Sequence, residues 1–102
     1  MISPISFSSK YQVSTKPHKG FSIRKKDVES EKKFRMFRNY CSALVQCNDN
    51  ISVDYDYIAQ QKYPYYFEGK ITLQTPDSMD KEIEHYLEFN KIKYNKLKNP
   101  QN

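Results

Sequence analysis

An α+β domain with the element order β-α-β-β-α-β is predicted by two kinds of side-chain periodicity in this chain. Four segments alternate apolar and polar residues, which is typical of strands, and two repeat apolar residues at helical spacing. At 102 residues the chain has room for one hydrophobic core. We therefore expect a single domain over residues 5–97, with flexible tails at 1–4 and 98–102.

The first strand is predicted over residues 5–15, where apolar side chains fall on odd positions: Ile5, Phe7, Tyr11 and Val13. Pro17 and Gly20 then predict a turn at 16–20, because both residue types interrupt regular structure. Residues 21–26 fit either a short second strand or the start of a helix.

A long helix is predicted from about Asp27 to Gln46. Asp27 is suited to capping the first free amide groups. One face carries an apolar stripe: Phe34, Phe37, Cys41 and Leu44. The opposite face is polar throughout: Lys32, Arg35, Asn39, Ser42 and Gln46. A wide apolar face with a polar back predicts a helix that packs on a sheet.

A hairpin is predicted after the helix, from strands over 51–57 and 65–74 that are joined by a short connection. The apolar residues of the two alternating rows are expected to face the core: Ile51, Val53, Tyr55, Phe67, Ile71 and Leu73. Gly69 interrupts the second row and suggests a bulge.

A second helix and a last strand complete the order. The sequence TPDS at 75–78 predicts a helix start with Asp77 or Ser78 as the cap. The helix is expected to end at Asn90, in a left-handed conformation. Alternation of apolar residues with lysines then predicts a strand over 92–97.

This element order resembles the ferredoxin-like fold over most of the chain. The resemblance implies an antiparallel sheet with two helices packed on one face. It depends on order and periodicity, and no family-specific sequence motif accompanies it. Because that fold hosts many unrelated activities, the resemblance implies no function.

Charge is distributed unevenly along the chain. The net charge is +5, but residues 1–50 hold ten Lys or Arg and four acids, whereas 51–89 hold three and eight. Residues 90–102 add four lysines and no acid. We therefore expect a surface with separate basic and acidic regions, which weakens the inference from a basic composition to nucleic acid.

Contact with another protein is the leading functional hypothesis. Six aromatic residues lie between Tyr55 and Phe67, and they cannot all point into the core. Aromatic side chains beside mixed charge are typical of protein interfaces. The predicted protein-binding residues lie at the hairpin and on its open face: Tyr63, Tyr66, Asp54, Asp56 and Glu68. Such a chain would be an inhibitor or regulator of a larger macromolecular machine.

Binding of nucleic acid through the first helix is the alternative. Basic residues gather there and at its entry: Lys25, Lys26, Lys32, Lys33, Arg35 and Arg38. Such a cluster would bind phosphates through charge, although a solvated helix face is the more ordinary explanation. The segment YYFEGKITL lacks the signature of an RNA-recognition module, which shares this element order. A homodimer through an unpaired strand edge also stays open.

We expect no enzyme, no metal site and no cofactor. Asp54, Asp56 and Glu68 would suit a Mg²⁺-dependent hydrolase, but the same residues fit ordinary alternation on a wet sheet face. His18 and His85 show no zinc spacing with the cysteines, and no glycine-rich phosphate loop is present. The spacing of Cys41 and Cys47 on one helix disfavours a disulfide. Without a long apolar run or a leader pattern, we expect a cytoplasmic protein and no membrane partner.

Overall fold

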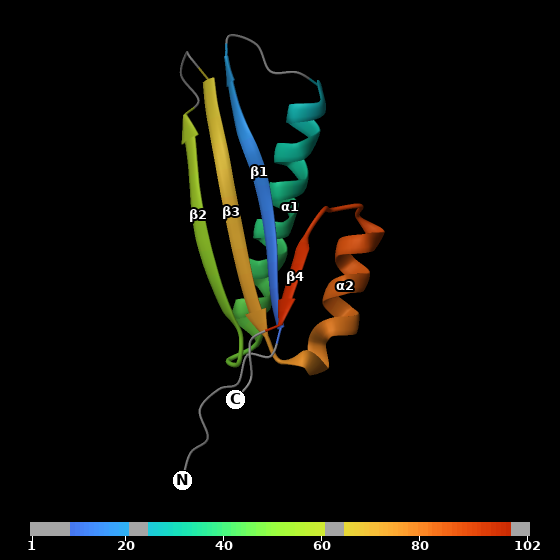
Figure 1. Ribbon diagram of the computed structural model, residues 1–102. Helices are drawn as coiled ribbons and strands as arrows, with labels where there is room; N and C mark the ends of the chain where they lie inside the picture. The colour runs from blue at the N-terminus through green and yellow to red at the C-terminus, as the bar shows by residue number, and fades with distance from the viewer. Residues whose placement is uncertain (1–8, 21–24, 61–64, 99–102) are drawn as a thin grey trace.

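The computed structural model describes residues 9–20, 25–60 and 65–98 of the chain. In chain order the elements are β1 (Ser9–Gly20), α1 (Lys25–Cys47), β2 (Ser52–Gln60), β3 (Tyr65–Thr75), the 3-10 helix η1 (Asp77–Met79), α2 (Asp80–Phe89) and β4 (Asn95–Lys98). The four strands form one antiparallel sheet in the order β2-β3-β1-β4 (Figure 1). The α+β class is confirmed. The exact six-element order is not matched, because η1 stands between β3 and α2.

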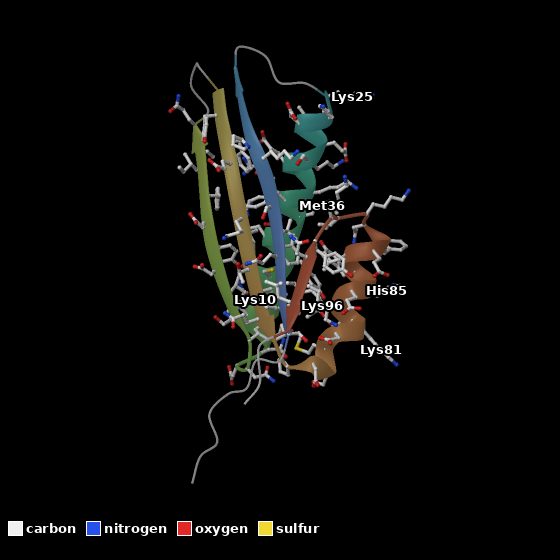
Figure 2. All side chains as sticks on the ribbon, viewed as in Figure 1. Lys10, Lys25, Met36, Lys81, His85 and Lys96 are labelled. Atoms are coloured by element: carbon white, nitrogen blue, oxygen red, sulfur yellow. The ribbon has the colours of Figure 1, made fainter. Side chains whose placement is uncertain are left out.

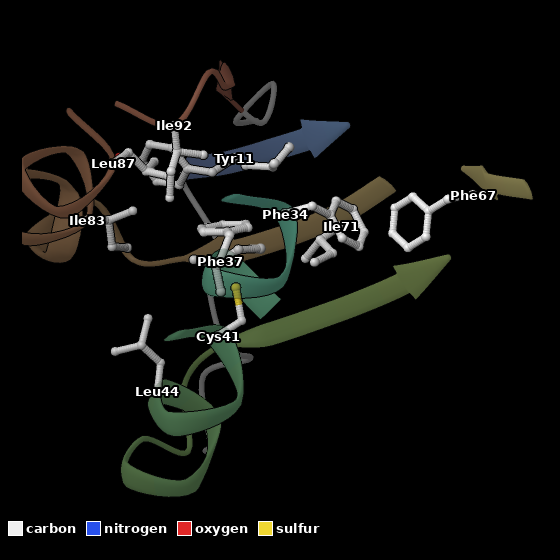
Figure 3. Close-up of a cluster of buried hydrophobic side chains, with 12 residues drawn as sticks. Tyr11, Phe34, Phe37, Cys41, Leu44, Phe67, Ile71, Ile83, Leu87 and Ile92 are labelled. Carbon is white, nitrogen blue, oxygen red and sulfur yellow. The ribbon is translucent and has the colours of Figure 1, made fainter. Parts of the chain in front are cut away.

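One face of the sheet and both helices enclose the hydrophobic core. Alternate side chains of the two central strands are buried: Tyr11 and Val13 from β1, and Phe67, Ile71 and Leu73 from β3. They join side chains of both helices in one cluster, shown in Figure 3: Phe34, Phe37, Cys41, Leu44, Ile83 and Leu87. Both helices therefore pack on the same face, and the other face of the sheet stays open.

The predicted turn at 16–20 is wrong, since these residues belong to β1. His18, Lys19 and Gly20 pair with the first residues of β3. The register between β1 and β3 shifts between Thr15 and His18, and this irregularity accommodates Pro17 within an extended strand. The bulge that Gly69 suggested therefore lies in the opposite strand. Ile5 and Phe7 lie outside the described residues.

The long helix and the hairpin agree with prediction to within a few residues, whereas the residues predicted to cap the helix ends are wrong. Asp27 lies inside the first turn of α1 and is not its cap, since the helix begins at Lys25. Pro76 precedes η1 and Met79 precedes α2, and neither makes a side-chain cap bond, so Asp77 and Ser78 are not the cap. The left-handed residue after α2 is Lys91, with φ 56°, and not Asn90.

The last strand is shorter than predicted. β4 begins at Asn95 and pairs with β1 from Ser9 to Gln12. Ile92 is buried in the core, but it lies in the segment between α2 and β4 and not in the strand. No helix in the described ranges is long and apolar enough to cross a membrane.

Two stacked tyrosines connect α1 and α2. The rings of Tyr40 and Tyr86 lie 3.8 Å apart at an interplanar angle of 4°. The Tyr86 hydroxyl donates to the Met36 carbonyl at 3.2 Å. The buried Tyr40 hydroxyl has no hydrogen-bond partner among the described residues, and burial raises the pKa of Tyr40 to about 12.

Replacing Tyr40 with phenylalanine is therefore expected to leave the free energy of unfolding unchanged or to raise it by up to about 1 kcal/mol. The ring stack is kept, and a buried hydroxyl without a partner is removed. Urea denaturation monitored by circular dichroism measures the difference. Tyr86→Phe is the matched control, and it should lose about 1 kcal/mol because it removes a hydrogen bond. A loss with Tyr40→Phe as large as that of the control would contradict this account.

Candidate functional site

Four of the five predicted protein-binding residues share the open face of the sheet. Asp54 and Asp56 lie on β2 and are exposed, and Tyr66 and Glu68 lie on β3 with Glu68 exposed. The pairing register places Asp56 opposite Lys70, the central cation of this face. Tyr63 lies outside the described residues. Side-chain alternation alone predicted this grouping, because residues two apart on a strand share a face.

Tyr66 and Glu68 are coupled along β3. The Tyr66 hydroxyl donates to Glu68 Oε1 at 2.6 Å, and this hydrogen bond to a carboxylate raises the pKa of Tyr66. Tyr66 therefore stays neutral at physiological pH, and its ring lies beside the Glu68 carboxylate. Such a ring offers contact area to a partner, but it provides no base for catalysis.

A shallow hollow of about 380 Å³ lies beside this pair on the open face. Its polar rim is formed by Asp56, Glu68, Lys70 and Ser14. The hollow lies beside the register shift of β1, and Gly69 is one of its lining residues. The open face thus combines a net acidic rim near β2 with a recess.

β2 is one of the two edge strands of the sheet and carries three exposed large apolar side chains. Tyr55, Tyr57 and Ile58 are 42%, 38% and 61% exposed. The prediction that Tyr55 belongs to the core is wrong: it points to the helix side of the sheet, but β2 extends beyond the cover that α1 provides. Ile58 occupies the polar phase of the alternation, opposite Glu68. An apolar residue in that phase was the sequence signal that could have identified it.

The helix side of the β2 edge carries a second hollow, of about 320 Å³. Tyr55 and Tyr57 from β2 and Arg38, Asn39 and Ser42 from α1 line it. Arg38 Nη1 donates to the Tyr57 hydroxyl at 3.4 Å. We call Tyr55, Tyr57, Ile58, Asp54 and Asp56 the β2 edge surface.

The six basic residues predicted for nucleic acid do not form one patch. Lys33 Nζ donates to the carbonyl oxygens of Asn90 and Lys91 at 2.8 and 3.2 Å. Arg35 lies 3.9 Å from Glu31 and covers the Phe67 ring at 5.1 Å. Each residue of a helix turns about 100° from the last, so basic residues spread over the sequence face different neighbours.

Three of the six predicted basic residues are exposed: Lys25, Lys26 and Lys32. Figure 2 shows Lys25 at the end of α1 that lies farthest from β4. Arg38 faces the β2 edge surface instead. The predicted basic helix face is thus divided among three directions.

A charged cluster that sequence analysis missed connects β1, β4 and α2. The Tyr11 hydroxyl lies 2.9 Å from both Asp80 Oδ1 and Glu84 Oε2. Lys96 Nζ donates to the same two carboxylates at 3.0 and 2.6 Å. Lys96 points from β4 toward α2 in Figure 2. The i,i+4 spacing of Asp80 and Glu84 was the sequence signal for this cluster. Tyr11 lies 69 and 73 residues before these two acids, so no local pattern connects it with them.

The pKa values in this cluster favour a structural role. Burial, followed by the hydrogen bonds to Glu84 and Asp80, raises the pKa of Tyr11. Burial would raise the pKa of Asp80, but hydrogen bonds from Lys96 and Tyr11 lower it. Hydrogen bonds from Lys96 and Tyr11 also lower the pKa of Glu84, and those carboxylates raise the pKa of Lys96. Every member keeps its ordinary protonation state at neutral pH, so none is poised to transfer a proton.

The nucleophilic and metal-binding residue types are dispersed. Burial raises the pKa of the Cys41 thiol to about 12, which keeps it protonated and unreactive, and Cys47 is an exposed free thiol. His85 is exposed on α2. Within the described ranges, no three His, Cys, Asp or Glu side chains are grouped so that they could hold a metal ion. Asp54, Asp56 and Glu68 therefore do not form a ligand set.

Comparison with protein-family models, curated proteins and solved structures finds no match to this chain.

Proposed function

We propose that this chain is a non-catalytic binding protein that acts by contact with another protein, as an inhibitor or regulator of a larger assembly. The observation that carries the proposal is the β2 edge surface. β2 pairs with β3 alone, so its other edge is unpaired within the described residues. Three large apolar side chains are exposed along this edge. An unpaired edge with apolar side chains accepts a strand from another chain.

β2 has few of the features that keep an edge strand from pairing with other chains. Its sequence SVDYDYIAQ contains no proline and no lysine, and its pairing with β3 is regular throughout. Only Asp54 and Asp56 carry charge. An antiparallel pair of two β2 strands centred near the middle of the strand would bring these acids close to their own copies. Like charges disfavour such a homodimer, and a different protein is the better partner.

We also propose that the fold is ferredoxin-like, with η1 as an addition. The antiparallel pairing of β3 with both β1 and β2 supports this, because it makes β1 and β2 parallel strands on either side of β3. The antiparallel placement of β4 beside β1 supports it as well.

The proposal is tested by replacing Ile58 with lysine and capturing partners from a lysate of the organism that carries this sequence. A bound protein should survive nuclease treatment and should fall about tenfold or more with Ile58→Lys, because a charge replaces a central apolar contact. Phe89→Lys is the matched control: Phe89 is 77% exposed on α2, away from β2, and its loss should leave capture unchanged.

Three results would argue against contact of the β2 edge surface with a different protein. Equal capture by both variants would place the contact elsewhere. Capture that disappears with nuclease would favour the nucleic-acid alternative. Sedimentation of the purified chain as a dimer that Ile58→Lys dissociates would favour a second copy as the partner.

A further inference from the structure

A groove of about 370 Å³ lies on the side of the molecule away from β2. It is bounded by the first turns of α1, by β1 above its pairing with β4, and by the segment after α2 (Figure 1). Four lysines line it: Lys26, Lys33, Lys91 and Lys93. We call it the lysine groove. Lys26 and Lys33 belong to the predicted basic helix, whereas Lys91 and Lys93 come from the segment after α2.

The charge of the groove is strongly positive. Glu29 is the acid among its lining residues. Lys33 is used within the fold, since its Nζ bonds to two carbonyl oxygens at the end of α2. Lys26, Lys91 and Lys93 are exposed and form no ion pair with any residue that the structure describes. These three lysines are therefore available to an anionic ligand.

The floor of the groove is apolar. Val13, Phe34 and Ile92 line it beneath the lysines, and all three are almost fully buried. Phe34 is 1% exposed, so its ring is not available for stacking on a base. Nucleic-acid sites for single strands depend on exposed aromatic rings, and this groove has none among its lining residues. A ligand with apolar groups between its charges suits this floor better than a chain of phosphates.

An unpaired strand edge runs along the groove. β4 pairs with β1 only from Ser9 to Gln12, and no described strand follows it on that side of β1. Val13, Ser14 and Thr15 are lining residues of the groove. Pro17 and the register shift end the regular edge soon afterwards. This short edge offers backbone hydrogen bonds to an extended segment beside it.

The backbone at Lys91 sets one lysine at the rim. Lys91 has a left-handed φ of 56°, a conformation in which glycine is the ordinary residue. Its amide donates to the Glu88 carbonyl at 3.1 Å, and the Ile92 amide donates to the Leu87 carbonyl at 2.9 Å. A lysine at this position costs stability relative to glycine, and it places an ammonium group at the rim of the groove.

We propose that the lysine groove binds an acidic segment of a partner protein in extended conformation, which adds as a short strand beside β1. Positive charge at the rim selects Asp or Glu, the buried floor accepts the apolar residues that alternate with them, and the β1 edge pairs with the backbone. The lysine groove shares no residue with the β2 edge surface, so this proposal does not depend on the proposed function.

The test uses a fluorescein-labelled peptide of alternating glutamate and valine, with binding to the purified chain followed by fluorescence anisotropy at two salt concentrations. Lys91→Glu/Lys93→Glu should weaken binding by about tenfold or more, because two attractive charges become repulsive. Lys81→Glu is the matched control, because Lys81 is exposed on α2 away from the groove (Figure 2). The affinity of this variant for the peptide should differ from that of the wild type by less than about twofold. Ile58→Lys should bind the peptide as the wild type does.

Lys91→Gly separates binding from folding. This variant should melt at a higher temperature than the wild type, since glycine adopts the left-handed conformation freely, and yet bind the peptide about threefold more weakly. Because Lys91→Gly is expected to be more stable than the wild type, misfolding could not explain a loss of affinity in this variant. Unchanged affinity together with a higher melting temperature would show that the lysine serves no ligand.

Strand addition is tested with two N-methylated peptides. One is methylated on the odd-numbered amides and the other on the even-numbered amides, because alternate amides of an extended chain point to opposite sides. Methylation of the amides that face β1 should abolish binding, whereas methylation of the amides that face away from β1 should be tolerated. If both methylated peptides bind as the parent does, no strand is added and the proposal is wrong. Equal binding of a valine–lysine peptide, or binding of a single-stranded oligonucleotide in place of the acidic peptide, would also overturn it.

Discussion

Replacing Gly69 with alanine is expected to lower the free energy of unfolding by about 2–3 kcal/mol. A Cβ atom at this position would lie 2.5 and 2.9 Å from two ring carbons of Phe34 and 2.8 Å from the Cβ of Tyr57. These distances are well inside van der Waals contact. The added methyl group therefore requires Phe34 to move.

Phe34 has little room to move. Its ring makes edge-to-face contacts with Phe67 at 5.5 Å and with Tyr57 at 5.7 Å between centroids. Gly69 is also fixed on its other side, where its amide donates to Thr15 Oγ1 at 3.0 Å. Gly69 thus allows α1 to approach the sheet at the point where the two central strands change register.

Urea denaturation of Gly69→Ala measures this effect, and a double-mutant cycle with Phe34→Leu tests its cause. Phe34→Leu alone should be destabilising, but the two losses should not add, because the smaller side chain relieves the contact with the new methyl group. A loss below about 0.5 kcal/mol for Gly69→Ala, or strict additivity in the cycle, would contradict the packing role of Gly69.

Replacing Tyr11 with phenylalanine is expected to lower the free energy of unfolding at neutral pH by about 1.5–3 kcal/mol. The ring of Tyr11 is fully buried, and its hydroxyl lies between two carboxylates of α2. Hydrogen bonds to charged acceptors contribute more than those between neutral groups. Thermal or urea denaturation at pH 7 gives the loss directly.

The loss should depend on pH in a defined window. The pKa values of Asp80 and Glu84 are lowered by folding, so their contribution is present above about pH 4.3 and is lost as the pH falls through the folded-state values. The pKa values of Tyr11 and Lys96 are raised, so their contribution is present below about pH 10 and is lost as the pH rises through the folded-state values. The difference between wild type and Tyr11→Phe should therefore be largest near neutral pH and should shrink in acid.

Tyr94→Phe is the matched control for this prediction. Its hydroxyl donates to Glu88 at an exposed position, at 3.1 Å, so the same deletion should cost less than about 0.5 kcal/mol. Equal losses for the two variants at pH 7 would contradict a special role for the cluster. A loss for Tyr11→Phe that stays constant down to pH 2 would show that packing, and not the carboxylates, explains it.

Much of the fold could be predicted because periodicity is a property of neighbouring residues. The apolar stripe from Phe34 to Leu44 predicted α1, and the alternation of Asp54 and Asp56 with tyrosines predicted β2 and its open face. The same reasoning failed at 16–20, where Pro17 and Gly20 favour a turn in isolation. Pairing of this segment with the long strand β3 outweighs that local preference.

The candidate sites could be predicted less well. Asp54, Asp56, Tyr66 and Glu68 do share a surface, as the alternation indicated. Tyr55 was assigned to the core, since alternation reports the side of a strand and not how far a helix covers it. Ile58 was passed over because it breaks the pattern that located its neighbours.

The amino-acid sequence by itself determined the α+β class, the order of the strands and long helices along the chain, and the set of residues that share the open face. Only the tertiary structure decided which strand edges stay unpaired, that the basic residues of α1 face three directions, and that Lys91 and Lys93 lie beside Lys26. It also brought Tyr11 to Asp80 and Glu84. The physical reason is that side-chain periodicity reports neighbours within an element, whereas contacts between elements depend on the register and packing of the whole chain.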